Sequence, residues 1–115
     1  MAYMSFEDLE VWKRSCDVAV TIYGCLKNCQ DYGLKSQMTR AAVSIASNIA
    51  EGAERQTGPE FRQFLHIAKG SAAELRTQVH IADRVNILST ETTESISREL
   101  SDISRMLHGL IKSIK

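Results

Sequence analysis

Proline and glycine are scarce in this sequence, which has one proline and six glycines in 115 residues. An all-β sandwich needs many tight turns, so this scarcity argues against that fold class. Nowhere do about 18 uncharged apolar residues follow one another, which excludes an ordinary membrane-spanning helix. Excess charge is also missing, because Lys and Arg number 14 and Asp and Glu number 14. Any nucleic-acid contact must therefore rest on a local basic patch.

The sequence also lacks the features of a secreted protein. Its N-terminal residues contain neither a basic segment nor an apolar segment, so they do not form a secretory signal. Its three cysteines, Cys16, Cys25 and Cys29, are an odd number. A secreted protein would keep one thiol unpaired, whereas in the reducing cytoplasm all three serve as small apolar groups. We therefore predict a cytoplasmic protein that does not enter a membrane.

Four stretches do show apolar residues every three or four positions, the spacing of one face of an α-helix. They predict helices over residues 6–28, 34–54, 59–85 and 90–114. Gly33 is expected to form a flexible joint and Asn86 a left-handed helix stop, while Pro59 and Ser89 (or Thr90) begin the third and fourth helices. Because short connections favour antiparallel neighbours, we predict one all-α domain over residues 1–115, an antiparallel up-down-up-down four-helix bundle.

The first predicted helix has two apolar stripes where a surface helix of a monomer needs one. One stripe comprises Leu9, Trp12, Cys16, Ala19, Tyr23 and Leu26. The other comprises Val11, Val18, Ile22 and Cys25, and continues to Cys29. Contiguous apolar strips are generally avoided on monomers, so we predict that Val11, Val18, Ile22 and Cys25 form a homo-oligomer interface. The alternative is an irregular bundle that buries this helix on both sides.

Catalytic and metal-binding motifs are not found. Helical bundles often hold paired metal ions through Glu-x-x-His motifs, and no such motif occurs here. Cys25 and Cys29 lie one helical turn apart, but no third ligand lies near them in the sequence. His66, His80 and His108 lie on predicted helices without a nucleophile turn or phosphate-binding loop. We predict no catalytic residue, no metal site, no cofactor and no enzymatic activity.

Four basic residues, Arg55, Arg62, Lys69 and Arg76, recur every seven positions. We call them the basic row, since this spacing places them along one edge of the third helix. Repeated around an oligomer, the row would follow a phosphate backbone. The alternative is a solvated flank that forms salt bridges with acids of the fourth helix.

Polar residues also interrupt the apolar pattern of the second helix. They are Ser44, Ser47, Asn48 and Glu51, and Ser71 and Glu74 are their expected neighbours on the third helix. They predict an interhelical hydrogen-bond network that sets the packing of the two helices. A small ligand pocket at Asn48, Glu51 and Ser71 is the alternative.

The segment from Gln37 to Gly52, read as QMTRAAVSIASNIAEG, resembles the signature of the bacterial 23S rRNA intervening-sequence proteins. The opening Phe6-x-x-Leu9-x-Val11-Trp12 and the later Ala68-Lys69-Gly70-Ser71-x-x-Glu74-Leu75 resemble the same family. The resemblance implies a four-helix protomer, ring-shaped pentamers and no established enzymatic activity. It also extends, more distantly, to the accessory protein of diversity-generating retroelements, which binds nucleic acid and a reverse transcriptase.

Two positions depart from this signature. Thr39 stands where a second arginine is frequent, and Ala46 stands where proline is frequent. The first change removes a base from any nucleic-acid surface, and the second leaves the helix straighter. Our leading hypothesis is a homo-oligomeric scaffold, expected to be a pentamer, that associates with RNA or a ribonucleoprotein. The alternative is a protein-interaction adaptor that contacts no nucleic acid.

Overall fold

The computed structural model of the chain describes residues 5–115, so the first four residues of the predicted domain lie outside it. The described part contains one short 3-10 turn, η1 (Phe6–Asp8), followed by four α-helices and no strand. The helices are α1 (Glu10–Cys25), α2 (Tyr32–Ala53), α3 (Gly58–Arg84) and α4 (Thr90–Ser113). The fold is therefore all-α, as predicted.

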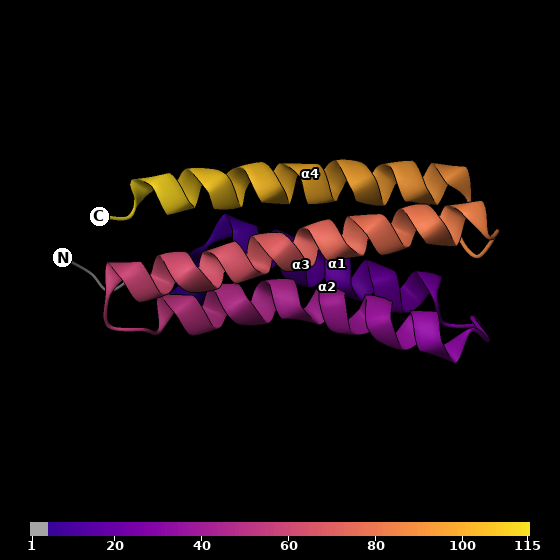
Figure 1. Cartoon of the computed structure of the whole chain (residues 1–115), viewed down its shortest axis with the longest axis horizontal. Helices are drawn as coiled ribbons and strands as arrows, with labels where there is room; N and C mark the ends of the chain where they lie inside the picture. The colour runs from indigo at the N-terminus through magenta and orange to yellow at the C-terminus, as the bar shows by residue number, and fades with distance from the viewer. Residues whose placement is uncertain (1–4) are drawn as a thin grey trace.

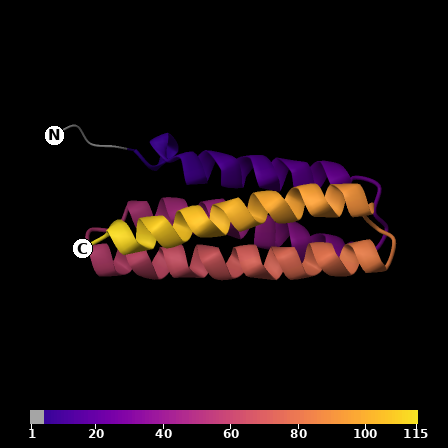
Figure 2. The ribbon, with the colours of Figure 1, turned by 90° about the horizontal axis from the view of Figure 1, so that it is seen from above.

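The four helices lie side by side along the long axis of a molecule that measures 49 × 21 × 20 Å (Figure 1). Seen from above, the first turn of α1 and the end of α4 lie at the same end of the molecule (Figure 2). No helix in residues 5–115 combines the length and the hydropathy that crossing a membrane requires. Surface hollows remain between α1 and α2 and between α3 and α4.

The boundaries of the first two helices differ from the prediction. The first helix is interrupted at Leu9, whose backbone is extended (φ −75°, ψ 123°), and it ends at Cys25 rather than at residue 28. The second begins at Tyr32 because the Asp31 side chain accepts a hydrogen bond from the backbone N–H of Leu34 (3.0 Å). Gly33 therefore lies inside the first turn of α2, and the expectation of a flexible joint there is wrong.

The predicted signals at the later helix ends are confirmed. Thr57 caps α3, with Pro59 in its first turn, where a missing N–H is tolerated. Asn86 has φ 64°, the left-handed conformation that ends a helix. The Ser89 side chain caps α4 by accepting a hydrogen bond from the N–H of Thr92 (3.1 Å). Local chemistry thus determines where these helices start and stop.

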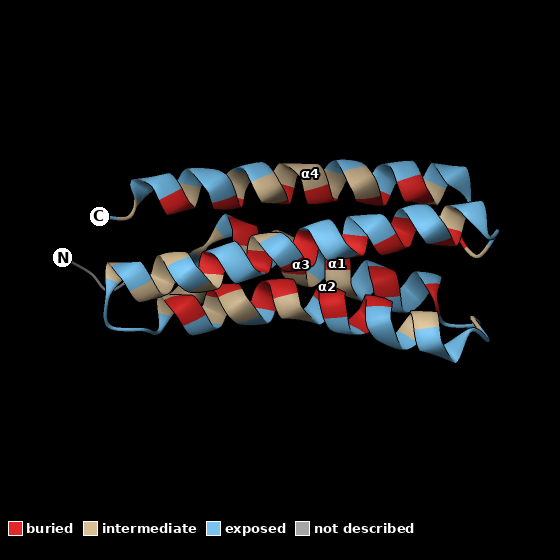
Figure 3. Ribbon diagram, viewed as in Figure 1, coloured by how far each residue is buried: buried red, intermediate tan, exposed pale blue. Residues whose placement is uncertain are grey.

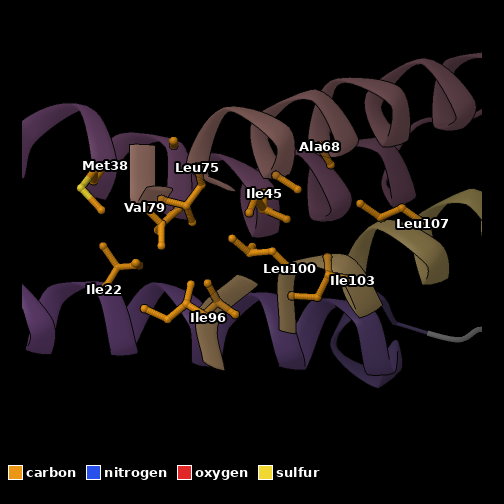
Figure 4. Packing of buried hydrophobic residues seen from close by; sticks show 14 of the residues in the cluster. Ile22, Met38, Ile45, Ala68, Leu75, Val79, Ile96, Leu100, Ile103 and Leu107 are labelled. Atoms are coloured by element: carbon orange, nitrogen blue, oxygen red, sulfur yellow. The ribbon is translucent and has the colours of Figure 1, made fainter. Parts of the chain in front are cut away.

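Each helix buries one side and exposes the other (Figure 3). Buried side chains from all four helices form one core, where Ile22, Met38 and Val79 approach one another at one level and Ile45, Leu100 and Ile103 at another (Figure 4). Burying each large aliphatic side chain contributes about 1.5–3 kcal/mol relative to exposure. Because these side chains come from all four helices, burial of the core stabilises the packing of each helix against the others.

This core corrects the predicted oligomer interface. Val11 and Val18 are each only 4% exposed and Ile22 is fully buried, all within a single chain. These three side chains cannot meet another subunit, so the interface prediction is wrong for them. Cys25 is exposed. The bundle buries the second stripe of α1 and leaves part of the first stripe at the surface, so it does not bury this helix on both sides as the alternative expected.

Candidate nucleic-acid interface

Basic side chains from two helices line one groove between α3 and α4. The groove has a volume of about 630 Å³. We call it the cationic groove, and its lining residues are Lys69, Arg76, Ser101, Ser104, Arg105, His108, Gly109 and Lys112. The lining contains four permanent cations, one histidine and no acid. A concentration of one charge sign in a concave surface attracts polyanions more strongly than the same charges would when scattered.

Most of these cations are free to bind a ligand. No salt bridge in the described part of the chain involves Lys69, Arg76 or Lys112. Arg105 pairs with Asp102, one turn before it on α4. Its side chain is 70% exposed, and a surface pair of this kind contributes little stability, so Arg105 can exchange Asp102 for a phosphate at small cost.

A second hollow continues the cationic groove toward the other end of the bundle. It is lined by Ala73, Arg76, Thr77, His80 and Ser97, and it shares Arg76 with the cationic groove. Its volume is about 500 Å³. The two hollows together form a long depression, bordered by basic residues and by small hydroxyl-bearing residues.

The basic row is divided by the structure. Lys69 and Arg76 line the cationic groove, as the proposed role requires. Arg55 lies in the turn after α2, where it pairs with Glu51 (2.9 Å) and covers the ring of Phe64. Arg62 is half-buried and donates a hydrogen bond to the carbonyl oxygen of Ile114 (3.1 Å). Arg55 thus contacts residues on either side of the turn between α2 and α3, and Arg62 contacts the residue that follows α4. Neither side chain lines the cationic groove.

Sequence analysis missed the residues that α4 contributes. Arg105, His108 and Lys112 follow one another at helical spacing, a signal that is present in the sequence. Their position opposite Lys69 and Arg76 could not be predicted from the sequence. That position depends on the register of the two helices, which the bond between Arg62 and Ile114 reveals by joining the start of α3 to the residue after α4.

A different groove, between α1 and α2, is almost entirely apolar. We call it the apolar groove; it has a volume of about 400 Å³ and is lined by Phe6, Trp12, Cys16, Ala19, Val43, Ala46, Ser47 and Ala50. Burial raises the pKa of the Cys16 thiol, and the neighbouring charge of Asp17 raises it further. Val20 (72% exposed), Tyr23 (54%) and Val43 (42%) are also large apolar residues at the surface of α1 and α2. The apolar groove and these exposed side chains together form the unburied apolar surface of α1 and α2. The second stripe of α1 does not contribute to this surface, because its side chains Val11, Val18 and Ile22 are buried.

Three of the polar residues predicted to form a network, Ser44, Asn48 and Ser71, are hydrogen-bonded to one another, whereas Ser47 lines the apolar groove. The hydroxyls of Ser44 and Ser71 are hydrogen-bonded (2.9 Å), and the Asn48 amide donates to both the carbonyl oxygen and the hydroxyl of Ser44. Glu51 pairs with Arg55 instead of joining them. The network's side chains thus bind one another, which supports the packing role. Within residues 5–115, no cluster of His, Cys, Asp and Glu has the three members that a metal site requires.

Two acids of α4, Glu99 and Asp102, contact α1. Arg14 donates two hydrogen bonds to the Glu99 carboxylate (2.6 and 2.8 Å) and one to Asp102 (3.1 Å). The bonds to Glu99, and secondarily those to Asp102, raise the pKa of Arg14 above its ordinary value. Glu99 and Asp102 are therefore engaged with α1, and Asp102 also pairs with Arg105 of the cationic groove. The lining of that groove itself contains no acid.

The family model described as 23S rRNA-intervening sequence protein matches residues 7–109. The chain belongs to this family. A crystal structure of a protein with unknown function from the S23 ribosomal protein family of Bacteroides thetaiotaomicron is 30% identical, with a TM-score of 0.83. The similarity covers 90% of this chain and 99% of that one. A comparison with curated proteins finds no match.

The motifs of the 23S rRNA-intervening sequence family occupy defined positions in this fold. Ser44, Asn48 and Ser71 form the network that joins α2 to α3. Gly52 ends the signature at a close contact between α2 and α3, since a Cβ there would lie 2.6 Å from the Cβ of Phe64. The family motifs therefore account for helix packing. The cationic groove draws most of its residues from outside them.

Proposed function

We propose that this chain is a non-enzymatic, homo-oligomeric scaffold that binds RNA, either free or within a ribonucleoprotein. The observation that carries the proposal is the cationic groove, where Lys69, Arg76 and Lys112 extend from two helices without an acidic partner. Neutralising phosphates with such cations releases counterions and drives association. The formal net charge of zero limits this attraction to the groove.

The proposed protomer is an antiparallel up-down-up-down bundle. The hydrogen bond from Arg62, near the start of α3, to Ile114, just after α4, supports an antiparallel orientation of these two helices. We propose that protomers assemble through the apolar groove, which takes an apolar patch of the next copy. That patch consists of Ile81 and Val85, one helical turn apart at the C-terminal end of α3, which are 46% and 55% exposed. A contact between two different surfaces is heterologous, and it generates a ring when its rotation closes. We propose that it closes here, as a pentamer.

The proposed location is the cytoplasm. The three cysteines, Cys16, Cys25 and Cys29, all carry free thiols. A reducing compartment keeps thiols in this state, whereas an oxidising one would pair or modify the exposed Cys25.

RNA binding is tested by filter retention of a structured RNA across a salt series. We expect retention at micromolar protein, weakening steeply as salt rises. The variant Lys69→Ala/Arg76→Ala removes two groove cations and should lower the slope of log K against log salt by about 2, roughly one for each phosphate contact. The matched control, Lys27→Ala/Arg98→Ala, removes two exposed cations outside the groove and should retain the wild-type slope. Wild-type protein that shows no salt-sensitive retention would rule out this function.

A protein-interaction adaptor is the second candidate, and the apolar groove favours it. An open, apolar-lined surface of this kind also suits an amphipathic helix of another protein. Under this reading, the RNA-retention experiment is negative for all variants, and Val43→Glu abolishes a protein contact instead. The two candidates therefore differ in whether the wild-type protein retains RNA at all.

A further inference from the structure

The basic residues of the cationic groove are arranged in two parallel lines. Lys69 and Arg76 on α3 are seven residues apart, as are Arg105 and Lys112 on α4, which corresponds to about 10.5 Å along each helix at 1.5 Å per residue. The adjoining hollow extends the depression past Arg76 to His80 and Ser97. We call these two adjoining hollows the trough; it follows α3 and α4, which lie side by side (Figure 1), and both helices contribute cations to the cationic groove.

Side chains that stack on bases do not line this trough. None of the residues that form the two hollows is Phe, Tyr or Trp. The described aromatic residues lie elsewhere: Phe6 and Trp12 at the apolar groove, Phe61 and Phe64 near Gly52, and Tyr23 and Tyr32 toward the loop between α1 and α2. Proteins that bind single strands gain about 1–3 kcal/mol for each base stacked on an aromatic ring, and this trough has no such ring to offer.

Side chains that pair with adenine and cytosine edges are absent from the lining, so base reading there would be limited to guanine contacts by Arg or Lys and to hydroxyl contacts. The lining contains no Asn, Gln, Asp or Glu, which pair with adenine and cytosine. The lining also includes small residues, which are Ala73, Ser97, Ser101, Ser104 and Gly109. Hydroxyl groups in such a lining can bond to phosphate oxygens and to the ribose 2′-OH, which all sequences share.

The difference between a single strand and a duplex follows from these observations. A flexible strand must be ordered to lie in the trough, and ordering costs conformational free energy for each nucleotide. Without stacking, only phosphate contacts offset that cost. A duplex presents its phosphates already ordered, and double-stranded RNA is recognised mainly through its shape, phosphates and 2′-OH groups.

We infer that the cationic groove binds the sugar–phosphate backbone of double-helical RNA and does not read its sequence. The inference rests on the proposed function and specifies the form of RNA that the groove takes. Lys69, Arg76, Arg105 and Lys112 contact phosphates, while the serines of α4 contact the backbone between them. The bases remain stacked and paired inside the duplex, away from the protein.

The test is a binding titration with a labelled RNA strand that has no internal pairing, and with the same strand annealed to its complement. At equal salt, we expect the duplex to bind at least about tenfold tighter, a difference of about 1.4 kcal/mol. A second duplex of shuffled sequence should bind within about twofold of the first, since no base is read. The Lys69→Ala/Arg76→Ala variant should lose the preference for the duplex, and Lys27→Ala/Arg98→Ala should keep it.

The results separate this inference from the function on which it rests. Equal or tighter binding of the single strand would overturn the duplex inference and leave RNA binding standing. A strong preference for one duplex sequence would also overturn it, because it would require base contacts. Failure of both RNA forms to bind would remove the proposed function itself.

Discussion

Gly52 of α2 lies directly against α3, next to Phe61 and Phe64. A Cβ at this position would lie 2.6 Å from the Cβ of Phe64 and 3.1 Å from a ring carbon of Phe61. Because Phe64 Cβ is attached directly to the backbone, relief requires the helices to move apart. The family signature ends on this glycine, and the packing explains why a larger residue does not fit.

Gly52→Ala is therefore expected to destabilise the protein by about 1–3 kcal/mol, the range of overpacking substitutions. The measurement is equilibrium unfolding in urea, followed by circular dichroism. Gly70→Ala is the matched control, since a Cβ at Gly70 of α3 meets nothing within 4 Å. The control should stabilise the protein by about 0.5–1 kcal/mol, because alanine favours a helix interior. Equal effects of the two substitutions would contradict the close approach.

The cysteines should differ in reactivity. Burial and the charge of Asp17 both raise the pKa of Cys16, so less of its reactive thiolate is present at any given pH. Cys25 is exposed at the end of α1. Near neutral pH, iodoacetamide should modify Cys25 first and Cys16 last, as measured by peptide mass spectrometry over time. Raising the pH should accelerate the modification of Cys16, and modification of Cys16 before Cys25 would be inconsistent with this environment.

At the scale of the helices, one charged cluster holds α1 against α4. Arg14 lies between Glu99 and Asp102, and its side chain is 30% exposed. Partial exposure screens the attraction, so Arg14→Met should cost about 1 kcal/mol, the upper end for exposed pairs. A double-mutant cycle with Glu99→Gln isolates the coupling, which should shrink in concentrated salt. Arg105→Met, at a more exposed arginine, should change stability by less than about 0.5 kcal/mol. An Arg14–Glu99 coupling near zero would show that apolar packing alone docks α1.

The helices themselves were predictable from the sequence because the signals are local. Apolar spacing identified all four, and Asn86 and Ser89 marked their ends correctly. The choice of buried stripe on α1 was not predictable, since Val18 and Cys16 are both apolar and both lie on stripes of helical period. Which of them meets α2 and α4 depends on tertiary neighbours. The residues that α4 contributes to the cationic groove were not predicted for the same reason. Their position beside α3 depends on the register between the two helices.

At the scale of the whole molecule, two apolar surfaces remain without a partner inside one chain. The apolar groove lies between α1 and α2, and the patch of Ile81 and Val85 lies at the C-terminal end of α3. The cationic groove, between α3 and α4, is separate from the apolar groove. Assembly through the apolar surfaces would therefore leave each subunit's cationic groove open and would repeat it around the ring. A duplex that met two such grooves would bind more tightly than one groove allows.

The assembly is tested by breaking each surface separately. Val43→Glu places a charge in the apolar groove, and Ile81→Glu places one on the α3 patch. Each variant alone should fall to a single subunit by light scattering with helicity retained, because neither residue is buried in the core. Lys27→Glu, an exposed site outside both surfaces, should keep the wild-type mass.

Mixing the two variants decides whether these surfaces pair with each other. Ile81→Glu protein keeps an intact groove and Val43→Glu protein keeps an intact patch, so one of each should join through their two undamaged surfaces. The ring cannot close beyond that contact, and the mixture should therefore have the mass of two subunits. If the mixture stayed at the mass of one subunit, the groove and the patch would not be partners. If Val43→Glu alone kept the wild-type mass, the apolar groove would not be the surface through which the chain assembles.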